Sequence, residues 1–386
     1  MRGSYNLVYV ITFPDGTKWV ARIPEPSHTD SRKIESMVGT MRLISERTSL
    51  PLPIVHAYDS TRNNSLGYAY VLLSFIEGVP LSSIWTKLDA LTDANRRHIF
   101  EHVANSMAQL RVLEFDHIGE LEFSGPDRSY TIGPLRKIRE GQVVYEIGPF
   151  LAALSYINEF TSLLIDKYIE SPAYYAHYSF LRLLGLFLPD RRFDGPPFVL
   201  SPPDFDSQNV MVDPVTYDVT GFLDWDNVSV GPREGGYARY PAWITRDWDP
   251  PIYDWPPRSS LKEDSNDEEA GKPVPDGDDH VENSSSREEP PEVLQAHRDL
   301  YHAIYSDVDP IGAEATRHSH LYEAILFGIS QPALSSQIVL KLTSHVFDNE
   351  WTSLRRLLFG MEEGEWLASR CRGGGAPSGD LLADDV

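Results

Sequence analysis

The sequence has a single cysteine, a shortage of positive charge and no long apolar run. Because Cys371 is the only cysteine among 386 residues, an intramolecular disulfide and a cysteine-based zinc site are both excluded. The apolar run near 180–188 is interrupted by Arg182 and is far too short to span a bilayer, so no membrane partner is expected. The first six residues are too polar for a secretory signal, and we expect a cytoplasmic protein.

Acidic residues dominate the charge balance. Lys and Arg together number 34 against 57 Asp and Glu, which gives a formal net charge of −23. Such a chain repels phosphate backbones, so nucleic acid is not expected as a partner. Residues 258–292 hold 12 acidic and 4 basic residues with few apolar ones, and we interpret them as a disordered acidic insert. The Gly-, Ala- and Asp-rich residues 372–386 are interpreted as a disordered tail.

The first part of the chain predicts a small antiparallel sheet with one packed helix. Two β-rich runs flank the turn formed by Pro14-Asp15-Gly16-Thr17, and a longer apolar pattern with helical spacing follows. The predicted elements are a hairpin of 5–13 and 18–23, a helix over 31–46, and strands over 55–58 and 68–75. We place this N-terminal lobe at 1–77, with Gly78 as a candidate hinge.

From Leu91 onward the apolar spacing becomes mostly helical. The predicted helices cover 93–113, 150–170, 173–188, 293–306, 314–328, 333–345 and 349–370. Residues 78–371 are therefore expected to form a mainly helical C-terminal lobe around a short hairpin at 209–224. The fold class predicted is α+β, in two lobes.

The residues most informative about chemistry lie at 201–227. If the hairpin is centred between Thr216 and Tyr217, Asn209 lies opposite Asp224, with Cβ atoms about 5 Å apart. An amide oxygen and a carboxylate at that distance suit a hard cation such as Mg²⁺. Asp204, on the loop that enters the first strand, is placed to act as base toward a substrate hydroxyl beside a metal-bound phosphate.

Two other interpretations of these residues remain. Asp204 and Asn209 are also residues that commonly cap turns, and Asp224 is one that commonly ends a strand. Asp224 and Asp226 could instead form the nucleophile pair of a phosphatase, which requires them at the end of a strand in a parallel sheet.

The order of these parts resembles the aminoglycoside phosphotransferase and choline kinase family, which has a protein-kinase-like fold, and most closely its fungal branch. The residues that carry the resemblance are Gly3–Tyr9, Trp19–Ile23, Ser31–Ser49, Pro51–Pro53, Asp204–Asn209, Phe222–Asp226, Val230–Pro232 and Tyr240–Trp243. The resemblance covers nearly the whole part of the chain expected to fold.

The resemblance implies an ATP-dependent phosphotransferase that uses Mg²⁺ and acts on a small-molecule acceptor. Asp204 corresponds to the catalytic base, and Asn209 and Asp224 correspond to the magnesium ligands. Arg22 falls where the family has the lysine that contacts the nucleotide phosphates. The nucleotide-binding loop corresponds to the region of Ser4, Tyr5 and Asn6, which are therefore candidate nucleotide contacts.

Several positions depart from the family pattern. Pro202 replaces a histidine that supports the catalytic loop, and Arg22 replaces the phosphate-binding lysine, which is not a neutral exchange. Met37 falls where the family has the helix glutamate that pairs with that lysine, and Glu35 lies on the wrong face of the helix. The family's first strand is largely absent before Met1, which suggests a truncated product. These changes support an alternative function, a weakened or inactive kinase-like protein that binds nucleotide or a partner.

Three further groups of residues have weaker implications. We expect no zinc chemistry, on the interpretation that no two of the twelve histidines have the spacing of a zinc-binding helix. Asp247 and Asp249 are candidates for contact with a cationic acceptor, but we favour the interpretation that they are solvated loop residues. Four tryptophans could line a substrate pocket, but core and interface packing is the role we expect for them: Trp225, Trp243, Trp248 and Trp255.

Overall fold

The computed structural model describes residues 6–25, 30–85, 91–124, 129–139, 142–250, 253 and 288–346. The described residues of 1–156, 189–253 and 278–322 form one compact unit, and those of 157–188 and 323–386 form another. The nucleotide-contact candidates Ser4 and Tyr5, the predicted helix over 349–370, the tail and residues 258–287 of the acidic insert lie outside the described residues. The predicted lobe boundary at residues 77 and 78 stays a prediction.

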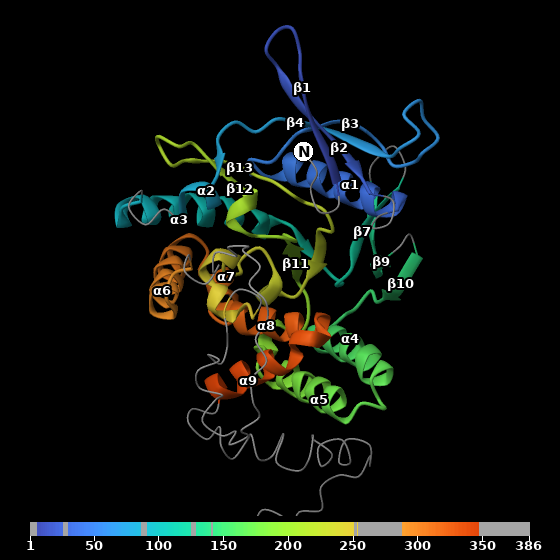
Figure 1. Ribbon diagram of the computed structural model, residues 1–386, viewed down its shortest axis with the longest axis vertical. Coiled ribbons are helices and arrows are strands. Elements are labelled where there is room, and N and C mark those ends of the chain that lie inside the picture. The colour runs from blue at the N-terminus through green and yellow to red at the C-terminus, as the bar shows by residue number, and fades with distance from the viewer. Residues whose placement is uncertain are drawn as a thin grey trace, which may run out of the picture. The chain divides into compact units, whose positions relative to one another are not determined.

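The N-terminal part has the predicted antiparallel sheet with one helix (Figure 1). Its elements are β1 (Asn6–Thr12), β2 (Lys18–Pro24), α1 (Ser31–Arg47), β3 (Val55–Asp59) and β4 (Tyr70–Ser74). The strand order is β1-β2-β4-β3, so β2 has a neighbour on each side. This central position gives Arg22 a fixed backbone, with Val8 on one side and Val71 on the other.

Local sequence signals explain why these elements form. In the turn between β1 and β2, Gly16 has φ 86°, a conformation that glycine adopts without steric cost. Asp30 caps α1 by accepting a hydrogen bond from the backbone nitrogen of Lys33 at 3.0 Å. The apolar stripe of α1 is buried at Ile34, Met37, Val38, Met41 and Ile44. Burying each such side chain contributes roughly 1.5–3 kcal/mol to folding.

The rest of the chain is mainly helical but contains more strands than expected. The helices are α2 (Ser82–Trp85), α3 (Asp93–Met107), α4 (Ala153–Lys167), α5 (Pro172–Phe187), α6 (Pro291–Val308), α7 (Pro310–Thr316), α8 (Ser319–Ser330) and α9 (Ser335–Val346). The strands are β5 (Val79–Pro80), β6 (Glu114–Phe115), β7 (Glu120–Ser124), β8 (Ser129–Gly133), β9 (Leu135–Arg139), β10 (Gln142–Ile147), β11 (Phe198–Ser201), β12 (Val210–Val212), β13 (Val219–Phe222) and β14 (Ser229–Gly231). Together with the N-terminal sheet, these elements confirm the α+β class.

Two details of the prediction are corrected. The single helix expected over 314–328 is two helices, α7 and α8, separated by a turn at Arg317 and His318. Helix α7 also begins earlier than expected, at Pro310, where Asp309 caps it by accepting from the Gly312 nitrogen at 3.1 Å. The strands β7 to β10 were not predicted. Of these, β7 and β8 form an antiparallel pair. β7 packs against α1, where the Lys33 ammonium pairs with Glu120.

The acidic insert, predicted to extend to residue 292, ends before that residue. Helix α6 begins at Pro291, and Glu289 before it is held in a half-buried group. The carboxylate of Glu289 lies 3.2 Å from His297 Nε2 and 3.6 Å from Arg96 Nη2, and Trp85 Nε1 donates to it at 3.3 Å. Burial acts to raise the pKa of Glu289, but His297 and Arg96 outweigh it and hold that pKa below its usual range.

The second compact unit contains α5, α9 and most of α4 and α8. Helices α5 and α9 pack together, with Ile338, Val339 and Leu342 fully buried. Among the described residues, no single helix combines the length and apolar character needed to cross a bilayer. Among those residues, the two consecutive helical segments 319–330 and 332–343 reach the required length and apolar character only when taken together, and the chain bends by 119° at the break between them.

The strand β12 forms the centre of a three-stranded sheet with β13 on one side and β5 on the other. Gly78, just before β5, has φ 121°, and a Cβ atom there would lie 2.6 Å from the Val212 carbonyl oxygen. It would also lie 2.9 Å from Thr220 Oγ1, which donates to the Glu77 carbonyl oxygen. Glycine is therefore required at this position both by backbone conformation and by space.

Replacing Gly78 with alanine is expected to lower the free energy of unfolding by about 1–3 kcal/mol, since it adds strain and a clash with a backbone oxygen. Urea denaturation measures the change. Gly195→Ala is the control, because nothing lies within 4 Å of a Cβ at that position. Equal stability of the two variants would contradict the assignment.

Candidate active site

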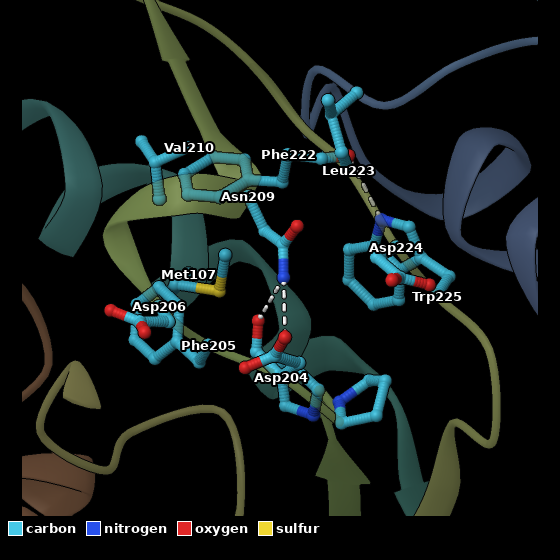
Figure 2. Close-up of a pocket in the computed structure, with 12 residues that line it drawn as sticks. Met107, Asp204, Phe205, Asp206, Asn209, Val210, Phe222, Leu223, Asp224 and Trp225 are labelled. Carbon is cyan, nitrogen blue, oxygen red and sulfur yellow. Dashed lines mark hydrogen bonds between the residues drawn. The ribbon is translucent and has the colours of Figure 1, made fainter. Parts of the chain in front are cut away.

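One pocket collects the residues singled out at 201–227 (Figure 2). It lies between the loop that precedes β12 and the residues that follow β13. Asp204, Asn209 and Asp224 all line it, as the sequence predicts. Its other lining residues are Met107, Pro202, Pro203, Phe205, Asp206, Val210, Phe222, Leu223 and Trp225.

Two amide groups fix the carboxylate of Asp204. Asn209 Nδ2 donates to Asp204 Oδ2 at 2.8 Å, and Gln208 Nε2 donates to the same oxygen at 3.0 Å. Asn209 Nδ2 also donates to the Asp204 carbonyl oxygen at 3.0 Å, which closes the loop on itself (Figure 2). With Oδ2 occupied by two donors, Oδ1 is the carboxylate oxygen left to accept a proton.

These contacts also determine how the Asn209 amide is oriented. The amide contacts two oxygens of Asp204, the carbonyl oxygen and Oδ2, and both can only accept hydrogen bonds. The atom of the amide that faces them must therefore be its donor, the nitrogen. The Asn209 Oδ1 atom is therefore turned away from Asp204. An amide oxygen in that position is a suitable ligand for a hard cation.

Arginines support this loop although Pro202 replaces the supporting histidine of the family pattern. Arg246 Nη2 pairs with Asp206 Oδ2 at 2.5 Å, and Arg239 Nη2 donates to the Pro203 carbonyl oxygen at 3.3 Å. The guanidinium of Arg239 also lies over the Phe205 ring, 5.8 Å from its centroid. The loop therefore has its own set of supporting contacts.

The hairpin register differs from the prediction by one residue. Val210 pairs with Phe222, and the Leu223 nitrogen donates to the Asn209 carbonyl oxygen at 2.7 Å, so Asn209 lies opposite Leu223 rather than Asp224. The turn is centred between Val215 and Thr216, one residue earlier than assumed, since the Asp213 nitrogen donates to the Asp218 carbonyl oxygen. An irregularity between Met211 and Val212 offsets part of this displacement, which leaves a difference of one residue at Asn209. Asp224 reaches the pocket because its backbone leaves the strand, with φ 57°. Aspartate tolerates this left-handed conformation better than most residues.

Arg22 connects the N-terminal sheet to the end of the hairpin. Its Nη2 atom lies 3.1 Å from Asp224 Oδ1 and 2.8 Å from Asp226 Oδ2, and the side chain is only 14% exposed. Asn6 Nδ2 donates to the same oxygen of Asp226 at 2.9 Å. The structure therefore places Arg22 and Asn6, predicted as nucleotide contacts, around Asp226.

Asp226 is the residue of this site whose role sequence reasoning missed. Its position two residues after Asp224 was the available signal, but its partners are more than 200 residues away in sequence. Burial raises the pKa of Asp226; Arg22 opposes this effect, and the nearby charge of Asp224 adds to it. Two carboxylates thus share one guanidinium, and a cation bound beside them would oppose the rise in the pKa of Asp226.

Three other residues of the N-terminal part that the resemblance singles out have defined surroundings. Met37 is buried in α1, so no acidic group occupies the position of the family glutamate. Glu35 is exposed and accepts a hydrogen bond from Ser60 Oγ at 2.7 Å, away from Arg22. Lys18 pairs with Glu77 at 2.9 Å and therefore does not replace the missing lysine.

Asp247 and Asp249, predicted as contacts for a cationic acceptor, have different surroundings. Asp247 is buried and forms two hydrogen bonds to Arg298, at 2.6 and 3.1 Å, so it holds the core rather than a ligand. Asp249 Oδ1 is buried without a hydrogen-bond partner among the described residues, and burial raises the pKa of this carboxyl group. Asp249 remains a candidate contact.

Two further predictions are decided by the structure. Trp225, Trp243 and Trp248 are buried, as expected for core packing, and Trp255 lies outside the described residues. The phosphatase alternative does not fit, because the strand before Asp224 belongs to an antiparallel pair, not a parallel sheet.

The interpretation that no two histidines have the spacing of a zinc-binding helix was wrong. His98-Ile99-Phe100-Glu101-His102 places two histidines four residues apart, a signal present in the sequence. Both lie on α3, and Asp218 from the β12–β13 turn meets them.

Comparison with known proteins gives a family for most of the chain. Residues 2–254 match the family model described as "Phosphotransferase enzyme family". A protein of Debaryomyces hansenii named altered inheritance of mitochondria protein 9, mitochondrial, is 31% identical over 129 residues, which are 32% of this chain and 20% of that protein. A subtelomeric hrmA-associated cluster protein of Aspergillus fumigatus is 36% identical over 87 residues, 22% of this chain and 17% of that protein. The matched segments thus span about a fifth of these curated relatives.

Solved structures also resemble this chain at low sequence identity. The Plasmodium vivax ethanolamine kinase has a TM-score of 0.45 at 11% identity, over 95% of this chain and 80% of that one. A thermostable mutant of the aminoglycoside phosphotransferase APH(4)-Ia, in a ternary complex with AMP-PNP and hygromycin B, has a TM-score of 0.43 at 13% identity, over 97% and 93%.

The structural role of Asp247 leads to a stability prediction. Asp247→Asn is expected to lower the free energy of unfolding by about 3–5 kcal/mol, because it leaves the Arg298 charge buried without its counter-ion. Asp249→Asn, the matched neighbour, is expected to cost less than about 1 kcal/mol, since its carboxylate is already disfavoured by burial. Chemical denaturation measures both. If Asp247→Asn kept wild-type stability, the buried pair would not have the role assigned to it.

Proposed function

The chain belongs to the phosphotransferase enzyme family, and from this premise we propose that it transfers the γ-phosphoryl group of ATP to a hydroxyl group of a small acceptor. The observation that supports the proposal best is the convergence of Asp204, Asn209 and Asp224 on one pocket. The match to the family model covers all three residues and Arg22. Turn capping alone does not account for these residues, because it does not require Asp224 to line the same pocket as Asp204 and Asn209.

Asp204 is the proposed base. Its Oδ2 atom is held by Gln208 and Asn209, which fixes the direction of the carboxylate and leaves Oδ1 to receive the hydroxyl proton of the acceptor. The proton moves to Asp204 as the acceptor oxygen forms its bond to phosphorus and the bond to the ADP oxygen breaks. Little more than positioning and charge stabilisation is needed from the protein in such a transfer.

Asn209 and Asp224 are the residues that would hold Mg²⁺. They offer hard oxygen ligands, and the pocket has a fitting charge: Arg246 balances Asp206, and Arg22 balances only one of Asp224 and Asp226. Bound there, the ion would withdraw charge from the phosphate oxygens. The orientation of the Asn209 amide is set by Asp204, so the base and the metal ligand are positioned by one set of hydrogen bonds.

Arg22 is the proposed phosphate contact from the N-terminal sheet. A single nitrogen, Nη2, makes both contacts to carboxylates, and a guanidinium carries five N–H donors. Donors therefore remain for the phosphates of ATP while Arg22 stays in contact with Asp226. Asn6 would steady this arrangement through its bond to Asp226 rather than bind nucleotide directly.

A cationic acceptor fits the charge of the chain. The net charge of −23 attracts cations over a distance, and the buried Asp249 oxygen offers a local partner for an ammonium group. Amines and amino alcohols with a free hydroxyl group are therefore the acceptor class that we propose.

The second candidate function is a weakened member of the family that binds nucleotide without efficient transfer. One observation favours it: Arg22 Nη2 lies on Asp224, the carboxylate that would hold the metal ion. Met37 leaves Arg22 without the glutamate that holds the family lysine away from this position. Measurements of binding and of turnover separate the two candidates.

Mg·ATP is expected to raise the unfolding midpoint of the wild-type chain by about 5–10 °C at a hundredfold excess over the dissociation constant. Asp224→Asn should lose most of this shift, because it removes a charged oxygen ligand. Asp116→Asn, an exposed aspartate on the connection between β6 and β7, should keep the full shift. Differential scanning fluorimetry with ATP alone and with Mg·ATP gives the comparison. The absence of a shift in all three proteins would refute both candidates.

Asp204→Ala is expected to reduce phosphoryl transfer by about 10²–10⁴-fold while leaving the Mg·ATP thermal shift in place, since the base acts on the acceptor and not on the nucleotide. Transfer of labelled phosphate to a panel of amines, sugars and amino alcohols measures the rate. Asp116→Asn again serves as the control. Transfer that survives in Asp204→Ala would exclude this residue as the base, and binding without turnover in the wild type would favour the second candidate.

A further inference from the structure

A group of three metal-ligating side chains lies outside the pocket. His98 and His102 project from one face of α3, and Asp218 comes from the turn between β12 and β13. Their ligand atoms all lie within 4.8 Å of one another. The family resemblance does not explain this convergence, which joins two segments more than 110 residues apart.

Both imidazoles point at the same carboxylate oxygen. Asp218 Oδ1 lies 2.8 Å from His98 Nε2 and 3.3 Å from His102 Nε2, and the two ring centroids are 4.4 Å apart. In a tetrahedral zinc site with bonds of about 2.0–2.1 Å, two ligand atoms lie roughly 3.3 Å apart. The two separations from Asp218 are close to this value, and the ligand atoms of the two histidines lie within 4.8 Å of each other, so a rotation of the rings would admit an ion between the three atoms.

The carboxylate of Asp218 is oriented for this purpose by its own turn. Thr216 Oγ1 donates to Asp218 Oδ2 at 3.0 Å, which leaves Oδ1 facing the histidines. The turn is closed by the Asp213 nitrogen, which donates to the Asp218 carbonyl oxygen at 2.9 Å. Metal-binding carboxylates are commonly held by such hydrogen bonds from neighbouring residues.

The three side chains are accessible to an ion from solvent. His98 and His102 are each 40% exposed and Asp218 is 48% exposed. Glu101, between the histidines in sequence, pairs with Arg97 at 2.9 Å and is not directed at the group. The site would therefore have three protein ligands and one open position.

We propose that His98, His102 and Asp218 form a binding site for a divalent zinc-class cation. Two imidazoles and one carboxylate match the ligand preference of zinc. The ion would tie α3 to the turn of the hairpin whose opposite end carries Asn209 and Asp224. Helix α3 also contributes Met107 to the pocket, so the two elements joined by the ion are both elements of the pocket wall.

The test is a titration of the chelator-treated full-length chain with Zn²⁺ against a chromophoric indicator. One equivalent should bind, with affinity weakened at least about tenfold in His98→Ala, His102→Ala and Asp218→Asn. Thr216→Val should weaken it less, because it disturbs only the orientation of Asp218. Co²⁺ in place of Zn²⁺ should give a visible absorption band that those three ligand variants lose.

Two controls separate this site from others in the chain. His117→Ala, on the connection between β6 and β7, should bind Zn²⁺ as the wild type does. Asp224→Asn should also bind Zn²⁺ normally, so the result does not depend on the proposed phosphotransferase site. Because Asp218→Asn keeps the side-chain volume, it tests the site even where a histidine variant fails to fold. The proposal is overturned if the wild type binds no Zn²⁺, or if the three ligand variants bind it within twofold of the wild type.

Discussion

The ion pair of Arg22 with Asp224 and Asp226 is the interaction on which the arrangement of the pocket depends. It joins the central strand of the N-terminal sheet to the end of the hairpin more than 200 residues later. The guanidinium is largely withdrawn from solvent, so its charge has to be compensated locally. Asp224 and Asp226 supply that compensation, at 3.1 and 2.8 Å from the guanidinium.

The hairpin β12–β13 organises the chemistry at both of its ends. At the open end, Asn209 and Asp224 enter the pocket, and Asn209 also fixes the proposed base Asp204. At the closed end, Asp218 meets His98 and His102 of α3. A short antiparallel pair serves this purpose well, because each end is positioned by the same ladder of hydrogen bonds.

Local signals in the sequence were sufficient for the N-terminal sheet, its helix and most of the candidate residues, but not for strands β7 to β10. The Pro14–Thr17 turn, the stripe of α1 and the spacing of Asp204 and Asn209 are all readable within a few residues. The register of the hairpin was not, because the turn is centred one residue earlier than the prediction assumed and the ladder is irregular at Met211. The left-handed backbone of Asp224 was also not readable from the sequence. The partners of Arg22 were also beyond local reasoning, since Asp226 is brought to it only by tertiary folding. The histidine pair of α3 was readable and was overlooked.

The chain that connects the N-terminal sheet to the rest of the protein is itself part of the pocket's framework. Strand β5 pairs with β12 through Val79 and Pro80, and the Leu81 nitrogen donates to the Val210 carbonyl oxygen at 2.8 Å. Residues added between Val79 and Leu81 would break this pairing, because hydrogen bonds to β12 fix the register of that short edge strand. A chimaera that takes its N-terminal sheet from a relative must therefore take β5 and β12 from one and the same protein, because these two strands pair with each other.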